Sequence, residues 1–589
     1  MNDNNLDYNN FPAKKFAYFF LLFFLVNIFI SIFLALSIFS VLQGLISLII
    51  IVFLSSYFIL YRDKNLSENF NFFLIIYLPI IFWSFFYFPA LNSNDDLPAY
   101  LVFLEKTATM GSLPIEPLSY RRMLSLGGLY PLQGSVSFFD LKYLSIIEPS
   151  LGILLTSTAI IILNNNFYSK LISIFLLCLT PLLGSRVLAN TGGVFILVFF
   201  SYINLFFFYH LVKLKDYRKK QYLIIIPILC IALSLAIKPI PFVFNFLIFF
   251  FLIIYLLVFN KLNIKFGYFI LIGIFFSLIY LYPFFKYSYL SSGTLVYPFL
   301  GEGWKTLSEL SSQRFNLNYK LPNLNDFLEI LFIYGRDPFF IFSLLLIGFL
   351  IKRKNNFYFC FSILISYLVF YTIIVLTAGD KEMIDDLNSF PILVGKYSVP
   401  ISFRYTFPIS LSIILLFINL FFENINFNIK KKLASKISIF FLLSILFFTW
   451  SLWGNEVNKN RKKIINSFDD NNLNVSLKEI SYIKEDKILV RSYYAINLYK
   501  KGFKNMVIFD APYEMVPWFY KKNKSEKNKL IKSGTTYTED FYTYLSRKNI
   551  KYIITDLDVN NSNFLSFLKN KTYLVSNLNS KYFYLYRIK

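Results

Sequence analysis

The chain has 589 residues, 56% of them hydrophobic, and a mean hydropathy of +0.56. Soluble globular proteins are rarely this apolar, and many separate apolar runs exceed the length that crosses a bilayer. These values exclude an ordinary soluble domain and predict a polytopic α-helical membrane protein. The net charge of +24 does not indicate a nucleic-acid partner, because lysine and arginine concentrate in short loops between apolar runs.

Residues 1–15 form a polar, asparagine-rich tail that ends in Lys14 and Lys15, and we expect this tail to be cytoplasmic. Hydrophobicity then predicts about thirteen membrane helices within the segment 16–455. They are expected near 16–40, 43–61, 70–90, 146–163, 168–184, 191–212, 222–237, 241–259, 266–285, 337–352, 356–377, 401–422 and 436–454.

The short basic clusters predict how these helices are oriented. With the N-terminus inside, every cluster falls on one side of the membrane, from Arg62 and Lys64 to the lysines at 430–432. An odd number of helices then places the C-terminal segment outside the cytoplasm. Three long loops are expected on the outer face, at 91–145, 286–335 and 378–400.

The last segment, 456–589, is hydrophilic and differs from everything before it. Short runs of β-branched and aromatic residues alternate there with polar helix-like stretches, which predicts a small extracytoplasmic α/β domain. Its two glycines, Gly502 and Gly534, form no phosphate-binding loop, so a nucleotide site is not expected. Strands are expected at 488–490, 506–509, 552–554, 573–575 and 582–586.

The loop 91–145 carries the first candidate chemistry. Asp95 and Asp96 stand side by side just after an apolar run, at the expected outer boundary of the membrane. Carboxylates near membrane depth are costly and are often functional. One of them can accept a proton from a hydroxyl group or bind a divalent metal. The alternative is structural, because Asp96 can cap a helix that begins at Leu97-Pro98.

Several cationic side chains on the expected outer face can neutralise a departing phosphate. Two of them, Arg121 and Arg122, lie in the same loop as the acidic pair, and arginine binds phosphate oxygens in a bidentate manner. For each cation the alternative is snorkelling or pairing with lipid headgroups. The candidate residues for binding phosphate or substrate are Arg121, Arg122, Arg186, Lys238, Arg404 and the aromatic Tyr297.

Three short motifs resemble one known group of proteins. The segment with Asn94-Asp95-Asp96, Arg121-Arg122 and Gly127-Gly128 looks like the first extracytoplasmic loop of bacterial membrane proteins related to the GT-C glycosyltransferase superfamily. The segment 292–299 is similar to their Gly-Asn-Pro-x-Tyr-Pro motif, although Thr-Leu replaces Asn-Pro. The segment 403–408 is similar to the Arg-Tyr-x-x-Pro that opens a late helix. The acidic pair follows the third expected helix, whereas it follows the first in typical members.

The resemblance implies a GT-C-like fold in a bacterial inner membrane, with the active site on the extracytoplasmic side. It implies transfer of a hexose or pentose from a polyprenyl-phosphate-linked donor to an envelope glycan, lipid or protein acceptor, with inversion at the anomeric carbon. Asp95 or Asp96 would match the acidic residue that serves as base or as ligand of Mg²⁺ or Mn²⁺. Arg404 would match a contact to the lipid phosphate.

Other functions remain open for such a chain. They are a transporter or flippase of lipid-linked saccharides, a polymerase of such saccharides, and an inactive GT-C relative. A transporter predicts charges within helices and internal repeats, but the sequence has few such charges beyond Lys238 and no clear repeat. The long outer loops and the external domain favour the glycosyltransferase.

Overall fold

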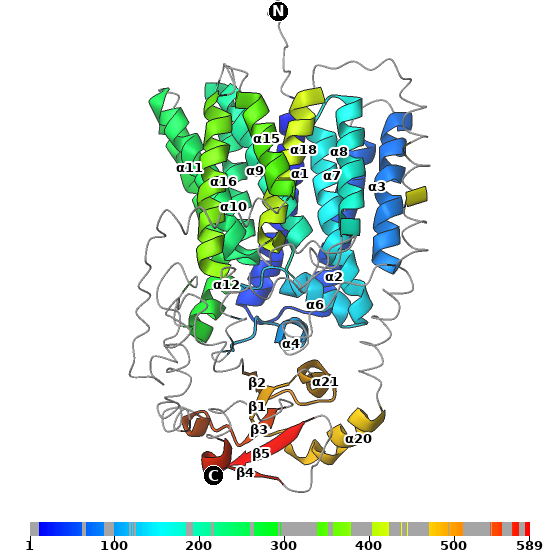
Figure 1. Ribbon diagram of the computed structural model, residues 1–589, viewed down its shortest axis with the longest axis vertical. Helices are drawn as coiled ribbons and strands as arrows, with labels where there is room; N and C mark the ends of the chain where they lie inside the picture. The colour runs from blue at the N-terminus through cyan, green and yellow to red at the C-terminus, as the bar shows by residue number, and fades with distance from the viewer. Residues whose placement is uncertain are drawn as a thin grey trace, which may run out of the picture.

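The chain forms a bundle of long helices with a small β-sheet beyond one end, as the computed structural model in Figure 1 shows. The structure describes residues 11–61, 66–86, 99–116, 119, 122, 125–183, 192–213, 217–259, 264–292, 295, 338–351, 357–378, 403–422, 438, 444–445, 471–492, 494–509, 542, 545–555, 568–575 and 583–589. Within these ranges, seven helices are long and apolar enough to cross a membrane. These elements agree with the predicted class, a helical membrane protein with a small C-terminal domain.

Twelve helices of the described chain make up the bundle, and each overlaps one of the first twelve expected membrane segments. They are α1 (Phe11–Ala35), α2 (Val41–Leu60), α3 (Leu66–Phe86), α7 (Gly152–Leu163), α8 (Phe167–Leu179), α9 (Val194–Lys213), α10 (Ile225–Ile237), α11 (Pro239–Val258), α12 (Ile264–Ser292), α15 (Pro338–Ile351), α16 (Phe357–Ala378) and α18 (Phe403–Phe422). Short 3₁₀ or π turns adjoin them at η3 (Ile146–Leu151), η4 (Thr180–Leu183) and η5 (Tyr217–Ile224). The thirteenth expected segment, 436–454, lies outside the described residues apart from positions 438, 444 and 445. The total of thirteen and the orientation in the membrane stay predictions.

Local sequence signals explain where some of these helices begin. Ser40 accepts the N–H of Gln43, and the Gln43 side chain accepts the N–H of Ser40 at 2.7 Å, so the two residues form a capping box before α2. Asn166 caps α8, because its side-chain oxygen accepts the N–H groups of Tyr168 and Ser169. Such caps satisfy amide groups that the first helical turn leaves unpaired.

Burial differs between the helices of the bundle. Most side chains of α9 are buried, from Val194 to Leu211, so α9 lies at the centre. Helices α2 and α12 instead expose large apolar side chains, such as Phe53 and Phe275. A soluble protein rarely exposes such extended apolar surface, whereas a bilayer solvates it.

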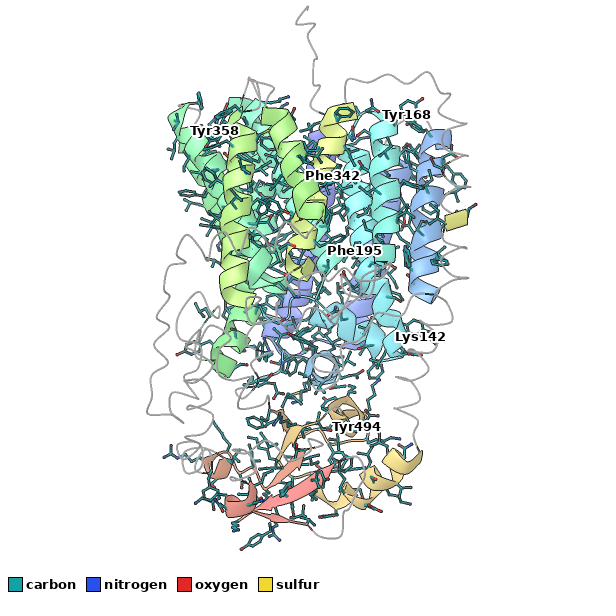
Figure 2. All side chains as sticks on the ribbon, in the orientation of Figure 1. Lys142, Tyr168, Phe195, Phe342, Tyr358 and Tyr494 are labelled. Carbon is teal, nitrogen blue, oxygen red and sulfur yellow. The ribbon has the colours of Figure 1, made fainter. Side chains whose placement is uncertain are left out.

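The two ends of the bundle hold different parts of the chain. Ser37, just after α1, hydrogen bonds to the Tyr287 hydroxyl near the end of α12 at 2.8 Å. This end faces the sheet, and we call it the sheet-facing end (Figure 1). The opposite end, the far end, holds the start of α1 and, in Figure 2, Tyr168 and Tyr358. Basic residues also lie at the far end, among them Lys14, Lys15, Lys213 and Lys220.

The segment 91–145, expected as a long outer loop, folds partly into short helices at the sheet-facing end. They are α4 (Leu101–Met110), α6 (Tyr130–Ser137) and the 3₁₀ turn η2 (Leu141–Tyr143). Every side chain from Leu101 to Ala108 is buried, and so is every residue of α6. The segment between the third and fourth expected membrane helices thus contains short helices, because their apolar side chains stabilise them by packing against the bundle. Its place on the outer face stays a prediction.

In the described part of the C-terminal segment, five strands form one sheet in the order β2-β1-β3-β5-β4. They are β1 (Ile488–Arg491), β2 (Met506–Ile508), β3 (Tyr552–Thr555), β4 (Thr572–Leu574) and β5 (Tyr584–Ile588), close to the five expected runs. Strand β1 runs parallel to β2 and β3, while β5 is antiparallel to β3 and β4. The helices α20 (Asn471–Glu479) and α21 (Ala495–Lys500) and the turn η8 (Ser481–Ile483) accompany the sheet, which confirms its mixed α/β character.

A neutral polar network joins helices α8, α9 and α18 near the far end. The side-chain oxygen of Asn419 accepts hydrogen bonds from Asn164, Ser169 and Ser173, at 2.7, 2.7 and 3.1 Å. The amide nitrogen of Asn419 donates to the Tyr202 hydroxyl. All five side chains are buried, so these polar groups satisfy one another in apolar surroundings.

Candidate functional site

Helix α4 lies between the bundle and the sheet in Figure 1. Its end is set by Gly111, whose φ of 71° is a left-handed conformation that favours glycine. A Cβ at this position would lie 2.9 Å from the carbonyl oxygen of Ser37. The Gly111 carbonyl also accepts the N–H of Phe39 at 3.1 Å. These contacts fix α4 to the chain that leaves α1.

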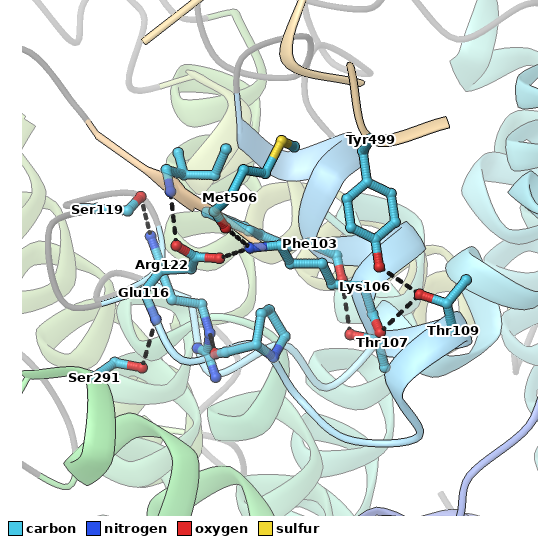
Figure 3. Close-up of polar contacts among 12 residues, drawn as sticks. Phe103, Lys106, Thr107, Thr109, Glu116, Ser119, Arg122, Ser291, Tyr499 and Met506 are labelled. Carbon is cyan, nitrogen blue, oxygen red and sulfur yellow. Dashed lines mark hydrogen bonds and ion pairs between the residues drawn. The ribbon is translucent and has the colours of Figure 1, made fainter. Parts of the chain in front are cut away.

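A buried ion pair joins α4 to the chain that follows it, as Figure 3 shows. The ammonium of Lys106 contacts Oε1 of Glu116, and the two side chains are only 6% and 1% exposed. Lys106 also donates to the carbonyl of Met506 at 2.6 Å, and Oε2 of Glu116 accepts the N–H of Ile508 at 2.8 Å. Each charge is therefore both paired and hydrogen-bonded, as buried charges generally must be.

The two backbone groups that this ion pair binds lie on the free edge of the sheet. Strand β2 is an edge strand, and its inner side pairs with β1, where the N–H of Ile488 donates to the carbonyl of Asn505. The alternation along a strand turns the Met506 carbonyl and the Ile508 N–H away from β1. The ion pair thus supplies hydrogen-bond partners to the outward-facing N–H and C=O groups of β2, as a neighbouring strand would.

A second line of contacts runs from α4 to α21. The ammonium of Lys500 lies 3.4 Å from Oε1 of Glu105, and the hydroxyls of Thr109 and Tyr499 share a hydrogen bond. Burial raises the pKa of the Glu105 carboxyl group, while Lys500 and then Lys504 act in the opposite direction. The C-terminal domain is therefore held against α4 at two places, its edge strand and its helix.

Arg122 is buried near Glu116, with 1% of its surface exposed. Its Nε donates to the carbonyl of Pro114 at 2.9 Å, and its Nη1 donates to the carbonyl of Ser125. The guanidinium carbon lies 6.0 Å from the ring centroid of Tyr130. Burial lowers the pKa of the guanidinium, and Tyr130 and then Glu116 oppose that shift. The remaining nitrogen, Nη2, is buried and has no hydrogen-bond partner in the described chain, so it can donate to an anion.

The segment after Arg122 packs on the end of α10, and Lys238 directly follows that helix. The N–H of Gly128 donates to the carbonyl of Ala236 at 2.9 Å. A Cβ on Gly128 would lie 2.8 Å from the carbonyl carbon of Ala236, so this close approach requires glycine. Lys238 follows two residues later, between α10 and α11, and its side chain is partly buried.

A further carboxylate, Glu148, lies at the start of α7. It is 4% exposed, and its φ and ψ of −129° and 109° break the helical turn just before Pro149. Oε1 accepts the N–H of Phe195 in the first turn of α9 at 2.7 Å, and the N–H of Val194 also faces the carboxylate. Figure 2 places Phe195 within the bundle, farther from the sheet than Lys142.

Within the described residues, Glu148 has a cationic neighbour and an open oxygen. The ammonium of Lys238 interacts electrostatically with the carboxylate. Oε2 is buried and makes no hydrogen bond to the part of the protein that the structure describes. The structure therefore brings a predicted cation, Lys238, beside a carboxylate that the sequence analysis did not select.

The other predicted site residues are less completely described. Arg404 lies in the first turn of α18, where only its backbone is described. One turn later the ring of Phe407 packs on Phe195 with the ring centroids 6.1 Å apart, so α18 begins beside Glu148. Five predicted residues lie outside the described ranges: Asp95, Asp96, Arg121, Arg186 and Tyr297.

Sequence reasoning missed the charged residues Glu105, Lys106, Glu116 and Glu148. The sequence contained two features that could have pointed to them. Glu148-Pro149 interrupts an apolar run that extends to residue 163, and an isolated carboxylate in such a run indicates a buried role. Glu105-Lys106 stands in a similar run, between Leu101 and Ala108. The partners of these residues on β2 and α21 had no signal in the sequence.

No protein-family model, curated protein or solved structure matches the chain. Function is therefore inferred from the residues of the sheet-facing end. Within the described ranges, no group of three or more His, Cys, Asp or Glu side chains is arranged to hold a metal ion. The predicted Mg²⁺ or Mn²⁺ site concerns Asp95 and Asp96, and it stays a prediction.

Proposed function

We propose that the chain is an integral membrane glycosyltransferase that uses a polyprenyl-phosphate-linked sugar as donor. The acceptor is an envelope glycan, lipid or protein, and the sheet-facing end of the bundle is the extracytoplasmic end. The observation that carries the proposal is Arg122, a buried guanidinium whose Nη2 has no hydrogen-bond partner in the described chain. A buried cation with an unused donor, at the end of a membrane bundle, suits the phosphate of a lipid carrier.

Two further features of this end support a phosphate site. Lys238 lies at the turn between α10 and α11, on the same side of the bundle as the segment that follows Arg122. The backbone of Arg404 lies in the first turn of α18, one turn before Phe407 and close to the first turn of α9. Arginine and lysine together can neutralise the charge of a departing polyprenyl phosphate.

In the proposed reaction, a hydroxyl oxygen of the acceptor attacks the anomeric carbon of the donor. The bond between that carbon and the phosphate oxygen breaks, and the oxygen leaves with the electron pair. Asp95 or Asp96 accepts the proton of the attacking hydroxyl. Arg122 and Lys238 stabilise the negative charge that develops on the polyprenyl phosphate.

The test uses the purified chain in proteoliposomes supplied with polyprenyl-phosphate-linked hexoses and pentoses and with an envelope extract as acceptor. Release of polyprenyl phosphate and labelling of the acceptor are measured together. Loss of the proton acceptor in Asp95→Asn or Asp96→Asn should lower the rate by about 10²–10⁴-fold. Arg122→Lys, which keeps the charge but not the planar fork, should lower it by about 100-fold.

Asp140→Asn is the matched control, because Asp140 is a partly exposed carboxylate whose oxygen accepts the N–H of Lys142, as an amide oxygen also can. This variant should keep the wild-type rate. Full product from both single aspartate variants and from the double variant would overturn the acidic site. No release of polyprenyl phosphate by the wild-type chain from any of these donors would overturn the proposed function.

A transporter or flippase of lipid-linked saccharides is the second candidate. The observation that favours it is the charged pair Glu148 and Lys238, which lies where helices break within the bundle. The same proteoliposomes separate the two functions. A flippase moves a fluorescent donor between leaflets without cleaving it, whereas a glycosyltransferase releases polyprenyl phosphate.

A further inference from the structure

Glu148 has no role in the reaction proposed above. An ionisable side chain inside a membrane helix is costly and is usually kept for a function. The surroundings of Glu148 are specialised as well, because its own backbone is not helical and Pro149 lacks the N–H that would continue the helical pattern. The carboxylate therefore lies at a break in the helix.

Helix capping explains only one of the two carboxylate oxygens. The N–H of Phe195 donates to Oε1 at 2.7 Å, which satisfies an amide of the first turn of α9. A neutral side chain could make this contact without burying a charge. Oε2 is buried as well and makes no hydrogen bond in the described chain. The second oxygen is therefore left for another partner.

The chemistry of that partner follows from the open atom. A carboxylate oxygen only accepts hydrogen bonds, so its partner must present an O–H or N–H group. Lys238 compensates the charge of Glu148 from the turn between α10 and α11. The donor proposed for this end of the bundle carries a sugar whose hydroxyl groups are such partners, and their bonds to a carboxylate are charge-assisted.

We propose that Oε2 of Glu148 binds a hydroxyl group of the lipid-linked sugar and thereby selects which sugar is transferred. This inference rests on the proposed glycosyltransferase function. In this arrangement Arg122 binds the phosphate of the donor, and Glu148 binds its sugar. A site that hydrogen bonds a substrate hydroxyl discriminates strongly against an analogue that lacks it, because the buried oxygen is then left unpaired.

The experiment compares wild-type protein with Glu148→Gln in proteoliposomes. The donors are polyprenyl-phosphate-linked hexoses and pentoses that the wild type uses, together with their single-deoxy analogues. The glutamine variant keeps an oxygen for the Phe195 N–H but replaces the open oxygen by an NH₂ group. Melting temperature in detergent reports whether the fold is retained, and Asp140→Asn is again the matched carboxylate-to-amide control.

We expect the wild type to use one deoxy analogue about 100-fold less well than its parent sugar. Glu148→Gln should lower kcat/KM for the parent by about tenfold and leave kcat/KM for that analogue nearly unchanged. The ratio of kcat/KM for the parent sugar to kcat/KM for the analogue therefore falls. A purely structural role of Glu148 would not change this ratio. Asp140→Asn should retain the wild-type discrimination.

The possible failures are distinguishable. If Glu148→Gln lowers kcat/KM equally for the parent and for every deoxy analogue, or lowers neither, the sugar-selecting role is wrong while the proposed function stands. If the wild-type chain transfers no sugar from any of the donors, the proposed function and this inference fail together.

Discussion

Two clusters of buried polar side chains in the helical bundle differ in their chemistry. In the cluster around Asn419, near the far end, the neutral amide has partners for both its oxygen and its nitrogen. The cluster toward the sheet-facing end contains charged groups, and Nη2 of Arg122 and Oε2 of Glu148 have no hydrogen bond to the described chain. The same apolar bundle thus contains a satisfied neutral network and a charged cluster with open atoms.

The difference indicates where the function lies. A satisfied neutral network fixes the packing of helices at modest net free energy and needs no further partner. A buried charged atom without a hydrogen bond costs free energy, so a fold keeps it only where something else repays that cost. We therefore expect substitutions in the Asn419 network to change stability alone, and substitutions in the charged cluster at the sheet-facing end to change activity or domain docking.

The largest effect is expected from the ion pair on the β2 edge. Glu116→Ala leaves the Lys106 ammonium buried without a counter-ion and removes the acceptor of the Ile508 N–H. Breaking such a pair should destabilise the folded protein by about 3–5 kcal/mol. Denaturant unfolding in detergent measures this loss, and hydrogen exchange of peptides that contain β2 should become faster.

A charge swap sharpens this prediction. The double variant Lys106→Glu with Glu116→Lys keeps two opposite charges, but it turns a carboxylate toward the Met506 carbonyl and an ammonium toward the Ile508 N–H. Neither contact is a hydrogen bond, so the swap should not restore stability. Recovery of wild-type stability by the swap would mean that the sheet edge plays no part in the contact.

A smaller effect is expected at the far end. Asn419→Ala removes the acceptor that Asn164, Ser169 and Ser173 share, and should destabilise the protein by about 1–3 kcal/mol. Because this network is distant from the sheet-facing end, the rate of sugar transfer per folded molecule should not change. A loss of that rate at unchanged donor KM, in samples matched for folded protein, would contradict the expectation that the Asn419 network contributes to stability alone.

The smallest effect is a pH dependence of the contact between α4 and α21. Burial raises the pKa of Glu105 above its ordinary value of 4.5, so the folded protein binds this proton more tightly than the unfolded chain does. The resulting stability is fully present below the unfolded pKa and is lost as the pH rises through the raised folded value. Melting temperatures recorded from about pH 4 to pH 8 should show this loss. The melting temperature of Glu105→Gln should not show this pH-dependent loss. The same pH dependence in the variant and the wild type would mean that other groups cause it.

The sequence predicted those parts of the molecule that depend on local pattern. Apolar run length predicted the bundle helices, and short runs of β-branched and aromatic residues predicted the strands of the C-terminal sheet, because both signals are complete within a short window. Arg122 was selected because it lies in the same loop as the acidic pair, and Lys238 because it is a cation on the expected outer face. The end of α12 was misplaced, because its last turns are polar and are held by contacts such as Ser291 to the N–H of Glu116.

The contacts that give these residues their roles have no local signal. Lys106 and Met506 are 400 positions apart, and Glu116 and Ile508 are 392 apart. Their pairing depends on which edge of the sheet meets α4, and no periodicity encodes that choice. Glu148 was overlooked because a single carboxylate barely changes the mean hydropathy of an apolar run, although it decides what the run can bind.

These separations also set an order of events during synthesis. Domains generally fold as they emerge from the ribosome, with the N-terminal parts first. Lys106 and Glu116 are made and inserted long before the strand that binds them exists. A part of the chain made late thus completes the hydrogen bonding of one made early. Arg122 lies next to that junction, so its surroundings reach their final form only after β2 has been made.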